Sequence, residues 1–197
     1  MIYTITFSPS LDYVMNVDSL ILGEVNRSKK EDYIAGGKGI NVSIMLNHLG
    51  EESVAMGFVG GFIGDYIQSS LNNDGIKTNF VHIEGNSRIN VKINSSSLET
   101  AINGNGPLIP QEKINELFEK INKISSGDTL VISGSVPNSL PKNIYENILS
   151  ICRQKNIITV VDCEKLLLVN TLKYNPFLIK PNQSELEQIF NQKTRFY

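Results

Sequence analysis

The sequence predicts an α/β fold in which a mainly parallel sheet carries helices on both faces, beside a small antiparallel β flap. Short apolar strand candidates alternate with amphipathic helix candidates along most of the 197 residues. Such alternation requires crossover connections, which cover both faces of a parallel sheet with helices. Two segments, about 13–34 and 88–103, instead hold strand-like runs without an intervening helix. We expect these two segments to form the flap.

Composition and charge narrow the functional classes. Hydrophobic residues make up 41% and charged residues 19% of the chain, and the formal net charge is -2. No basic block supports a nucleic-acid or anionic-membrane partner, and no apolar run approaches the ~18 residues that span a bilayer. The start is strand-like rather than a secretory signal. Two cysteines, Cys152 and Cys163, cannot build a disulfide framework, so we expect a cytoplasmic protein.

Hydrophobic periodicity assigns each element. The strand candidates are 2–7, 53–59, 129–133, 157–161 and 177–180. Apolar residues at helical spacing predict helices through 42–49, 66–71, 114–124, 144–151 and 166–172, and from Ser184 onward. Gly50 and Gly75 are placed to end the first two helices, because glycine readily adopts the left-handed conformation of a helix terminus. The strands and helices therefore alternate as the fold class requires.

A glycine-rich loop before the 42–49 helix is the strongest functional motif. Gly36, Gly37 and Gly39 surround Lys38, and Asn41 lies in the first helical turn. Glycines allow a close backbone approach to a ligand, and a helix N-terminus supplies free N–H donors. Lys38 adds a full charge. We interpret the loop as a binding site, with an ordinary glycine turn as the alternative, and its spacing matches neither a Walker A loop nor a dinucleotide fingerprint.

Other polar residues near strand ends are further candidates. Asp12 follows the first strand, and a carboxylate can accept two hydrogen bonds from sugar hydroxyls. Arg88 opens a flap strand, and its guanidinium suits a terminal phosphate, as does that of Arg27. The alternatives are an exposed loop aspartate and solvated surface charges. A second glycine cluster, 57–64, is either a tight strand-to-helix turn near the site or a direct contact.

The last strand leads into a candidate nucleotide site. Lys180 could meet a nucleotide phosphate, and Asn182 and Glu185 could hold magnesium mostly through its waters. The alternative is that Asn182 caps the last helix while Glu185 complements its dipole. The two interpretations are compatible. Cys163 has no paired histidine and is better explained as a buried thiol than as a nucleophile.

Together these motifs resemble, in order and spacing, the ribokinase-like (pfkB-type) carbohydrate kinases. The matching stretches are 8–12, 36–41, 60–61, 133–135 and 180–185. Within the family, the segments 25–27, 88–93 and 102–104 are most similar to those of 1-phosphofructokinases. The resemblance implies a Rossmann-like core with a β lid that often forms a dimer contact. It also implies ATP and Mg²⁺ as co-substrates.

The resemblance implies a role for each candidate residue. The sugar would be held by Asp12, Gly36, Gly37, Gly39, Asn41 and Asn90, its phosphate by Lys38, Arg88 and Arg27, and the pocket would be lined by Ser135. Lys180, Asn182 and Glu185 would serve the ATP phosphates and magnesium. The implied reaction is the phosphorylation of fructose 1-phosphate to fructose 1,6-bisphosphate. The alternatives are a tagatose-6-phosphate kinase and a non-catalytic sugar-phosphate-binding fragment.

The sequence also departs from the family pattern. Ser8 stands where many members carry asparagine, and the segment 163–165 is altered. The Gly-Ala-Gly-Asp loop, which supplies the catalytic base, is absent and would lie beyond Tyr197. We therefore expect residues 1–197 to form an incomplete kinase domain that dimerises through its lid and has little activity alone.

Overall fold

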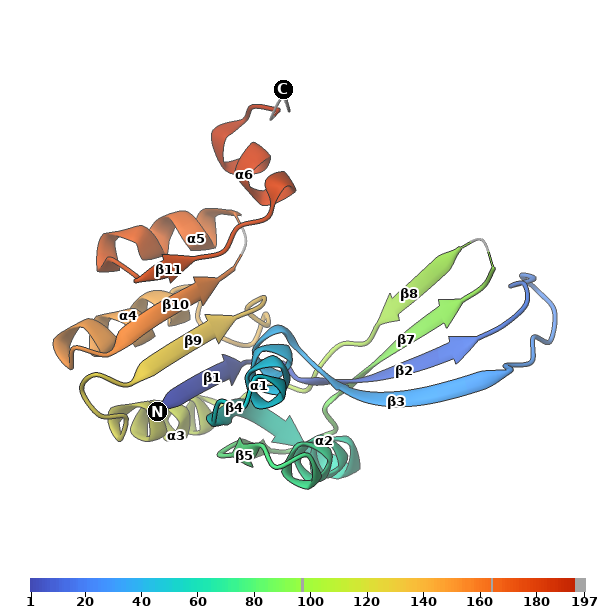
Figure 1. The fold of residues 1–197 in the computed structure, drawn as a ribbon, viewed down its shortest axis with the longest axis horizontal. Helices are drawn as coiled ribbons and strands as arrows, with labels where there is room; N and C mark the ends of the chain where they lie inside the picture. The colour runs from blue at the N-terminus through green and yellow to red at the C-terminus, as the bar shows by residue number, and fades with distance from the viewer. Residues whose placement is uncertain (97, 164, 194–197) are drawn as a thin grey trace.

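A computed structural model describes residues 1–96, 98–163 and 165–193, and it confirms the mainly parallel sheet. The main sheet has the strand order β11-β10-β9-β1-β4-β5, and β6 also pairs with β4 (Figure 1). Every pairing described within it is parallel. Its strands are β1 (Ile2–Thr6), β4 (Ser53–Gly60), β5 (Lys77–Thr78), β6 (Val81–Ile83), β9 (Thr129–Ser133), β10 (Ile158–Asp162) and β11 (Leu178–Ile179). The short strands β5 and β6 were not predicted, because they hold only two and three residues.

Helices cover both faces of this sheet, as the alternation predicted. They are α1 (Lys38–His48), α2 (Gly61–Asn73), α3 (Gln111–Asn122), α4 (Ile144–Gln154), α5 (Lys165–Thr171), the 3-10 turn η1 (Leu172–Tyr174) and α6 (Gln183–Phe190). Gly50 and Gly75 follow α1 and α2 with positive φ angles, as expected of helix-ending glycines. Among the described residues, no helix is long and apolar enough to cross a membrane.

The two faces of the sheet carry two separate cores. Successive strand residues point to opposite faces, and β4 shows the result. Ala55 and Val59 pack with the buried residues of α1 and α2, whereas Met56 and Phe58 pack with those of α3 and α4. In the second core the rings of Phe7 and Tyr145 meet edge to face at 5.6 Å. The sheet is thus fixed from both sides, and the ends of its strands form a firm base for a site.

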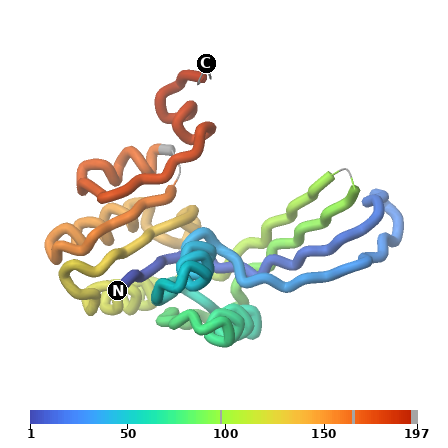
Figure 2. Tube along the Cα trace, viewed as in Figure 1, coloured from blue at the N-terminus to red at the C-terminus, as the bar shows by residue number. Residues whose placement is uncertain are grey.

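The predicted flap is a four-stranded lid that projects away from the main sheet (Figures 1 and 2). Its order is β3-β2-β7-β8, with bounds β2 (Ser10–Asn16), β3 (Lys30–Gly36), β7 (Arg88–Asn94) and β8 (Glu99–Asn103). The two outer pairs are antiparallel as expected, but the central pair β2–β7 is parallel. Each central strand follows a parallel strand of the main sheet, β1 or β6, so both enter the lid in the same direction.

The lid begins closer to the main sheet than the predicted boundaries 13–34 and 88–103. Strand β2 starts at Ser10 and β3 runs to Gly36, so Asp12 is itself a lid residue. Leu11 and Ala35 anchor the lid base in the core formed with α1 and α2. Because the base is buried while the strands project outward, side chains at the base are held in a fixed position next to the main sheet.

Candidate functional site

A cavity of about 320 Å³ lies where the carboxyl ends of β1 and β9 meet the N-terminus of α1 and the base of the lid. It is lined by Thr6, Phe7, Ser8, Gly37, Lys38, Arg88, Asn103, Ser133, Gly134 and Ser135. A second cavity of about 310 Å³ shares Ser8, Arg88 and Ser135 with it and extends between the loops 104–108 and 135–139. Ligands of open α/β sheets bind at this edge of the strands. The first cavity is therefore lined by four of the predicted residues, Gly37, Lys38, Arg88 and Ser135.

The glycine-rich loop has a structural role in addition to its predicted binding role. Gly37 precedes α1 with a φ of 128°, and a Cβ on it would lie 2.6 Å from Thr6 Cγ2. A Cβ on Gly39 would lie 2.6 Å from the carbonyl oxygen of Ile5. The hydroxyl of Thr6 accepts a hydrogen bond from the Ile40 amide at 3.0 Å. The loop thus seats α1 closely on β1, and Lys38 and Gly37 are the loop residues that line the cavity.

Asp12 lies at the centre of a hydrogen-bond network on the lid base. Its Oδ1 accepts from the Ser10 hydroxyl at 2.8 Å and from the Asn90 amide at 2.8 Å. Its Oδ2 lies 2.6 Å from Nζ of Lys92. Burial alone would raise the pKa of Asp12, but the hydrogen bonds from Lys92, Ser10 and Asn90 and the Lys92 charge hold this pKa below its usual value. Asp12 is therefore a firmly ionised acceptor rather than an exposed loop residue.

Arg88 lines both cavities. Its Nε donates to the carbonyl oxygen of Ser8 at 3.2 Å. The two terminal nitrogens remain for a ligand, and a guanidinium suits a phosphate group. Nearby, the Oδ1 of Asn90 and the hydroxyl of Ser133 are buried without a hydrogen-bond partner in the described part of the chain. Such unsatisfied groups are costly. The Asn90 oxygen needs a donor such as a ligand hydroxyl, whereas the Ser133 hydroxyl can also donate to a phosphate oxygen.

A second charged cluster lies where β10 and β11 end. Asp162 faces two lysines, with Lys38 Nζ 3.3 Å from its Oδ1 and Lys180 Nζ 3.5 Å from its Oδ2. Lys38 Nζ also lies 4.0 Å from Glu185 Oε1. Asp162 was not predicted as a site residue. Its position at the end of a parallel strand, the argument that singled out Asp12, could have identified it. Lys38 therefore joins the cavity to the candidate nucleotide site.

The start of α6 forms a capping box, which confirms the capping interpretation of Asn182 and Glu185. The Asn182 side chain accepts from the Glu185 amide at 2.8 Å, and Glu185 Oε2 accepts from the Asn182 amide at 2.8 Å. Among the described residues, no cluster of three metal-ligating side chains is present. Glu185 Oε1 and the Asp162 carboxylate remain as oxygens that suit magnesium bound mainly through its waters.

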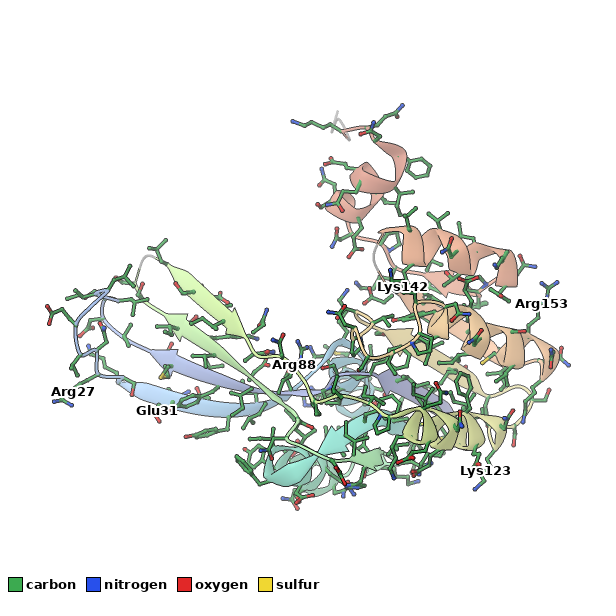
Figure 3. The ribbon with its side chains drawn as sticks, turned by 180° about the vertical axis from the view of Figure 1, so that it is seen from behind. Arg27, Glu31, Arg88, Lys123, Lys142 and Arg153 are labelled. Atoms are coloured by element: carbon green, nitrogen blue, oxygen red, sulfur yellow. The ribbon has the colours of Figure 1, made fainter. Side chains whose placement is uncertain are left out.

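The structure does not bring every predicted residue to the cavity. Arg27 lies at the far end of the lid, well away from Arg88 at its base (Figure 3). Asn41 is exposed on the first turn of α1. The predicted sugar-binding residues that line neither cavity are Asn41, Gly36, Gly39, Asp12 and Asn90. In the second glycine cluster, a Cβ on Gly57 would lie 1.9 Å from the carbonyl oxygen of Thr6, and none of the cluster lines the cavity. These facts favour the tight-turn interpretation of that cluster.

Both cysteines are buried, as the sequence predicted. Burial raises the pKa of the Cys152 thiol to about 12. A thiol that stays protonated at neutral pH is a poor nucleophile. Cys152 is therefore part of the core, within the cluster formed with α3 and α4.

A parallel α/β sheet, a glycine-rich helix N-terminus at its carboxyl edge and a cationic cavity at the base of a β lid are together typical of the class of α/β proteins that bind a phosphorylated ligand. The family comparison is consistent with this class, since the family model for pfkB family carbohydrate kinases matches residues 6–195. The chain belongs to the pfkB family of carbohydrate kinases.

Individual relatives agree with the family. The chain is 42% identical to "1-phosphofructokinase" of Bacillus subtilis over 96% of its own length, and 42% identical to "D-tagatose-1-phosphate kinase" of Bacillus licheniformis over 98%. The structure of Escherichia coli phosphofructokinase-2 in complex with substrates and products is 28% identical, with a TM-score of 0.93 over 98% of this chain and 64% of that one. The chain spans 62% and 63% of the two curated relatives' lengths.

Proposed function

We propose that this chain forms the sugar-phosphate-binding part of an ATP-dependent kinase whose substrate is fructose 1-phosphate and whose product is fructose 1,6-bisphosphate. The observation that carries the proposal is the cavity at the lid base. It places the cations Lys38 and Arg88 in one lining, and the anionic acceptor Asp12 lies outside that lining, near the start of lid strand β2. A sugar phosphate needs both kinds of group, since its phosphate is anionic and its hydroxyls are donors.

Two relatives support a substrate phosphorylated at carbon 1. The names of the Bacillus subtilis and Bacillus licheniformis relatives specify a 1-phosphofructokinase and a D-tagatose-1-phosphate kinase. The second name favours D-tagatose 1-phosphate as a second candidate substrate. Fructose and tagatose differ only in the configuration at carbon 4, so one phosphate subsite would serve both sugars. In this proposal Arg88, Lys38 and Ser135 hold the phosphate, and Asp12 with Asn90 holds the sugar hydroxyls.

The proposed chemistry is phosphoryl transfer, which depends mainly on positioning and charge neutralisation. A hydroxyl of the bound sugar phosphate attacks the γ-phosphorus of ATP, the bond to the β-phosphate oxygen breaks, and ADP leaves. Lys180 and Lys38, on either side of Asp162, would balance negative charge near the transferred group. Glu185 and Asp162 would hold magnesium through its waters, and the ion would further neutralise the phosphates.

The described residues offer no suitable proton acceptor for the attacking hydroxyl. Asp12 is held by Lys92, which together with its other hydrogen bonds lowers its pKa and makes it a weak base. Asp162 is paired with Lys38 and Lys180, and Glu185 caps α6. General acid–base catalysis needs a group with a pKa near the working pH. We therefore expect the 197-residue chain to bind substrate while turning over slowly or not at all.

We also propose that two copies pair through their lids. One row of the lid places Tyr33, Tyr13, Val91 and Ile102 side by side on the same face. Tyr33 is 54% and Ile102 61% exposed. Exposed apolar patches of this kind often mark protein interfaces. Such a dimer would let Arg27, at the far end of the lid, approach the partner rather than its own distant cavity.

Isothermal titration calorimetry tests the proposed function directly. Fructose 1-phosphate should bind the purified chain, and Arg88→Met should weaken this binding by a factor of about 10 or more, because a hydrogen bond to a charged group contributes roughly 1.5–3 kcal/mol. Arg153→Met is the matched control, since Arg153 lies on the body well away from Arg88 (Figure 3) and lines neither cavity. Absence of fructose 1-phosphate binding by the unaltered chain would refute the proposal. A coupled assay with ATP and magnesium checks the expected lack of turnover.

A further inference from the structure

We propose that Lys92 is a positioning residue of the sugar subsite, which fixes the Asp12 carboxylate in place and leaves it one acceptor position for a single sugar hydroxyl. This inference rests on the proposed function of the cavity. Neither Asp12 nor Lys92 belongs to the lining of the two cavities, and both lie on the lid strands beside it. Lys92 contacts Asp12 directly at 2.6 Å and would act through it.

The register of the lid explains why Lys92 reaches Asp12. Strands β2 and β7 run parallel, with Asp12 beside Asn90 and Val14 beside Lys92. Residues two apart on a strand point to the same face, so Arg88, Asn90 and Lys92 form one polar row next to Asp12. Lys92 approaches Asp12 diagonally and closes the outer side of its carboxylate at 2.6 Å. The side chain of Asp12 is 14% exposed and that of Lys92 36%.

Counting hydrogen bonds shows what remains for a ligand. A carboxylate has about four acceptor positions. Ser10 and Asn90 occupy two of them on Oδ1, and Lys92 occupies one on Oδ2. One position on Oδ2 is left. The sequence suggested that Asp12 accepts two hydrogen bonds from sugar hydroxyls. With only one acceptor position left, Asp12 can accept just one.

A single contact has a consequence for specificity. A carboxylate can accept hydrogen bonds with both oxygens from two neighbouring hydroxyls on one side of a sugar ring, but not from hydroxyls on opposite sides. The configuration at carbon 4, where fructose and tagatose differ, decides which of these arrangements the sugar has. With Lys92 in place, Asp12 contacts one hydroxyl and distinguishes the two sugars weakly. We expect the chain to bind fructose 1-phosphate and tagatose 1-phosphate with dissociation constants within a factor of about 3, well under the 10-fold that 1.4 kcal/mol gives.

Charges around Asp12 define the pH behaviour. On β7 it faces Lys92 and Arg88, and the same face of β3 carries Asp32, which is paired with Lys30 at 2.8 Å. Lys38 lines the neighbouring cavity. Removing the Lys92 charge takes away hydrogen bonding and attraction that favour the ionised carboxylate. Asp12 should then take up a proton at a higher pH, and sugar-phosphate binding should be lost at that higher pH.

The experiment compares the unaltered chain with Lys92→Met, Lys92→Arg and the control Lys30→Met, whose lysine forms an exposed ion pair elsewhere on the lid. Calorimetry with fructose 1-phosphate and tagatose 1-phosphate is run from about pH 3 to pH 8, so that the range extends below the usual aspartate pKa. We expect Lys92→Met to weaken fructose 1-phosphate binding by a factor of about 10 or more and to raise the pH at which binding is lost. Lys92→Arg should restore both, and Lys30→Met should match the unaltered chain.

The outcomes separate the two proposals. If the unaltered chain does not bind fructose 1-phosphate, the proposed function fails. If it binds, and Lys92→Met leaves both affinity and pH profile unchanged, the role of Lys92 is refuted. A weaker affinity with an unmoved pH profile would also refute it, because that result indicates a structural role only. If Lys92→Met does not fold, the pKa of the Asp12 carboxyl is measured instead in the unaltered chain by carbon-13 NMR titration, with and without fructose 1-phosphate. An ordinary carboxyl pKa would overturn the inference, and a lowered one that responds to ligand supports it.

Discussion

Replacing Gly39 by alanine should destabilise the protein, although alanine is the better helix former. Gly39 lies in the first turn of α1. A Cβ there would meet the Ile5 carbonyl oxygen and the Thr6 hydroxyl oxygen, each at 2.6 Å. Real Cβ atoms do not approach backbone atoms so closely, so α1 must move away from β1. The movement would carry Lys38 and the helix N-terminus with it.

The magnitude follows from two opposing effects. Alanine gains up to about 1 kcal/mol over glycine in a helix. Overpacking at a close contact costs about 1–3 kcal/mol, and the hydrogen bond from the Ile40 amide to Thr6 is strained as well. We therefore expect a net loss of about 1–2 kcal/mol in the free energy of unfolding. For a chain of this length the melting temperature should fall by about 2–8 °C.

Thermal and urea unfolding followed by circular dichroism measure this loss. Asn41→Ala is the matched control, because Asn41 is exposed two residues further along the same helix. That control should change the free energy of unfolding by no more than about 0.5 kcal/mol. A Gly39→Ala variant as stable as the unaltered chain would show that α1 has room at β1, and the packing argument would then be wrong.

Four further predictions test other parts of the structure. Tyr145→Phe removes the hydrogen bond to the Gly134 carbonyl oxygen at 2.7 Å and should cost about 1–3 kcal/mol in urea unfolding; no loss would contradict it. Leu117→Ala, in the core at 0% exposure, should cost about 2–5 kcal/mol, whereas Phe177→Ala at 80% exposure should cost under about 0.5 kcal/mol. Asp162→Asn removes the acid between two lysines and should tighten inorganic phosphate binding several-fold in calorimetry; weaker binding would count against this cluster. Because Asp12 has a lowered pKa when folded, its stabilising contribution is complete above pH ~4 and is lost as pH falls through the folded pKa. Asp12→Asn should reduce the loss of stability at acid pH in urea unfolding measured against pH. An unchanged loss would show that Asp12 does not cause it.

The sequence predicted the main sheet well because its signals are local. Strands β1, β9 and β10 each lie within about one residue of their predicted ranges, since a buried parallel strand is a continuous apolar run between turns. The parallel pairing of β2 with β7 was not predicted. It joins segments about 80 residues apart, and no local pattern records which distant strand a given strand will meet.

The candidate site was predicted in part for the same reason. Lys38 and Arg88 were identifiable because a glycine-rich helix start and a flap arginine are readable in sequence. The partners of Asp12 were not, because Lys92 reaches it only through the register of the lid. Asp162 could have been identified by its place at a strand end, but its pairing could not, because its lysine partners come from α1 and from the segment after β11. Charge pairs between distant segments need the fold before they can be assigned.

The parallel pairing of β2 with β7 sets an order of events during folding. The bond between Asp12 and Asn90 closes a loop of 78 residues that includes α1, β4 and α2. Closing a long loop is entropically costly until the segments between have been organised, and such non-local pairings slow folding. The body should therefore assemble before the lid does. The chain would then be able to bind a sugar only after the lid has formed, so ligand binding would indicate that folding is complete.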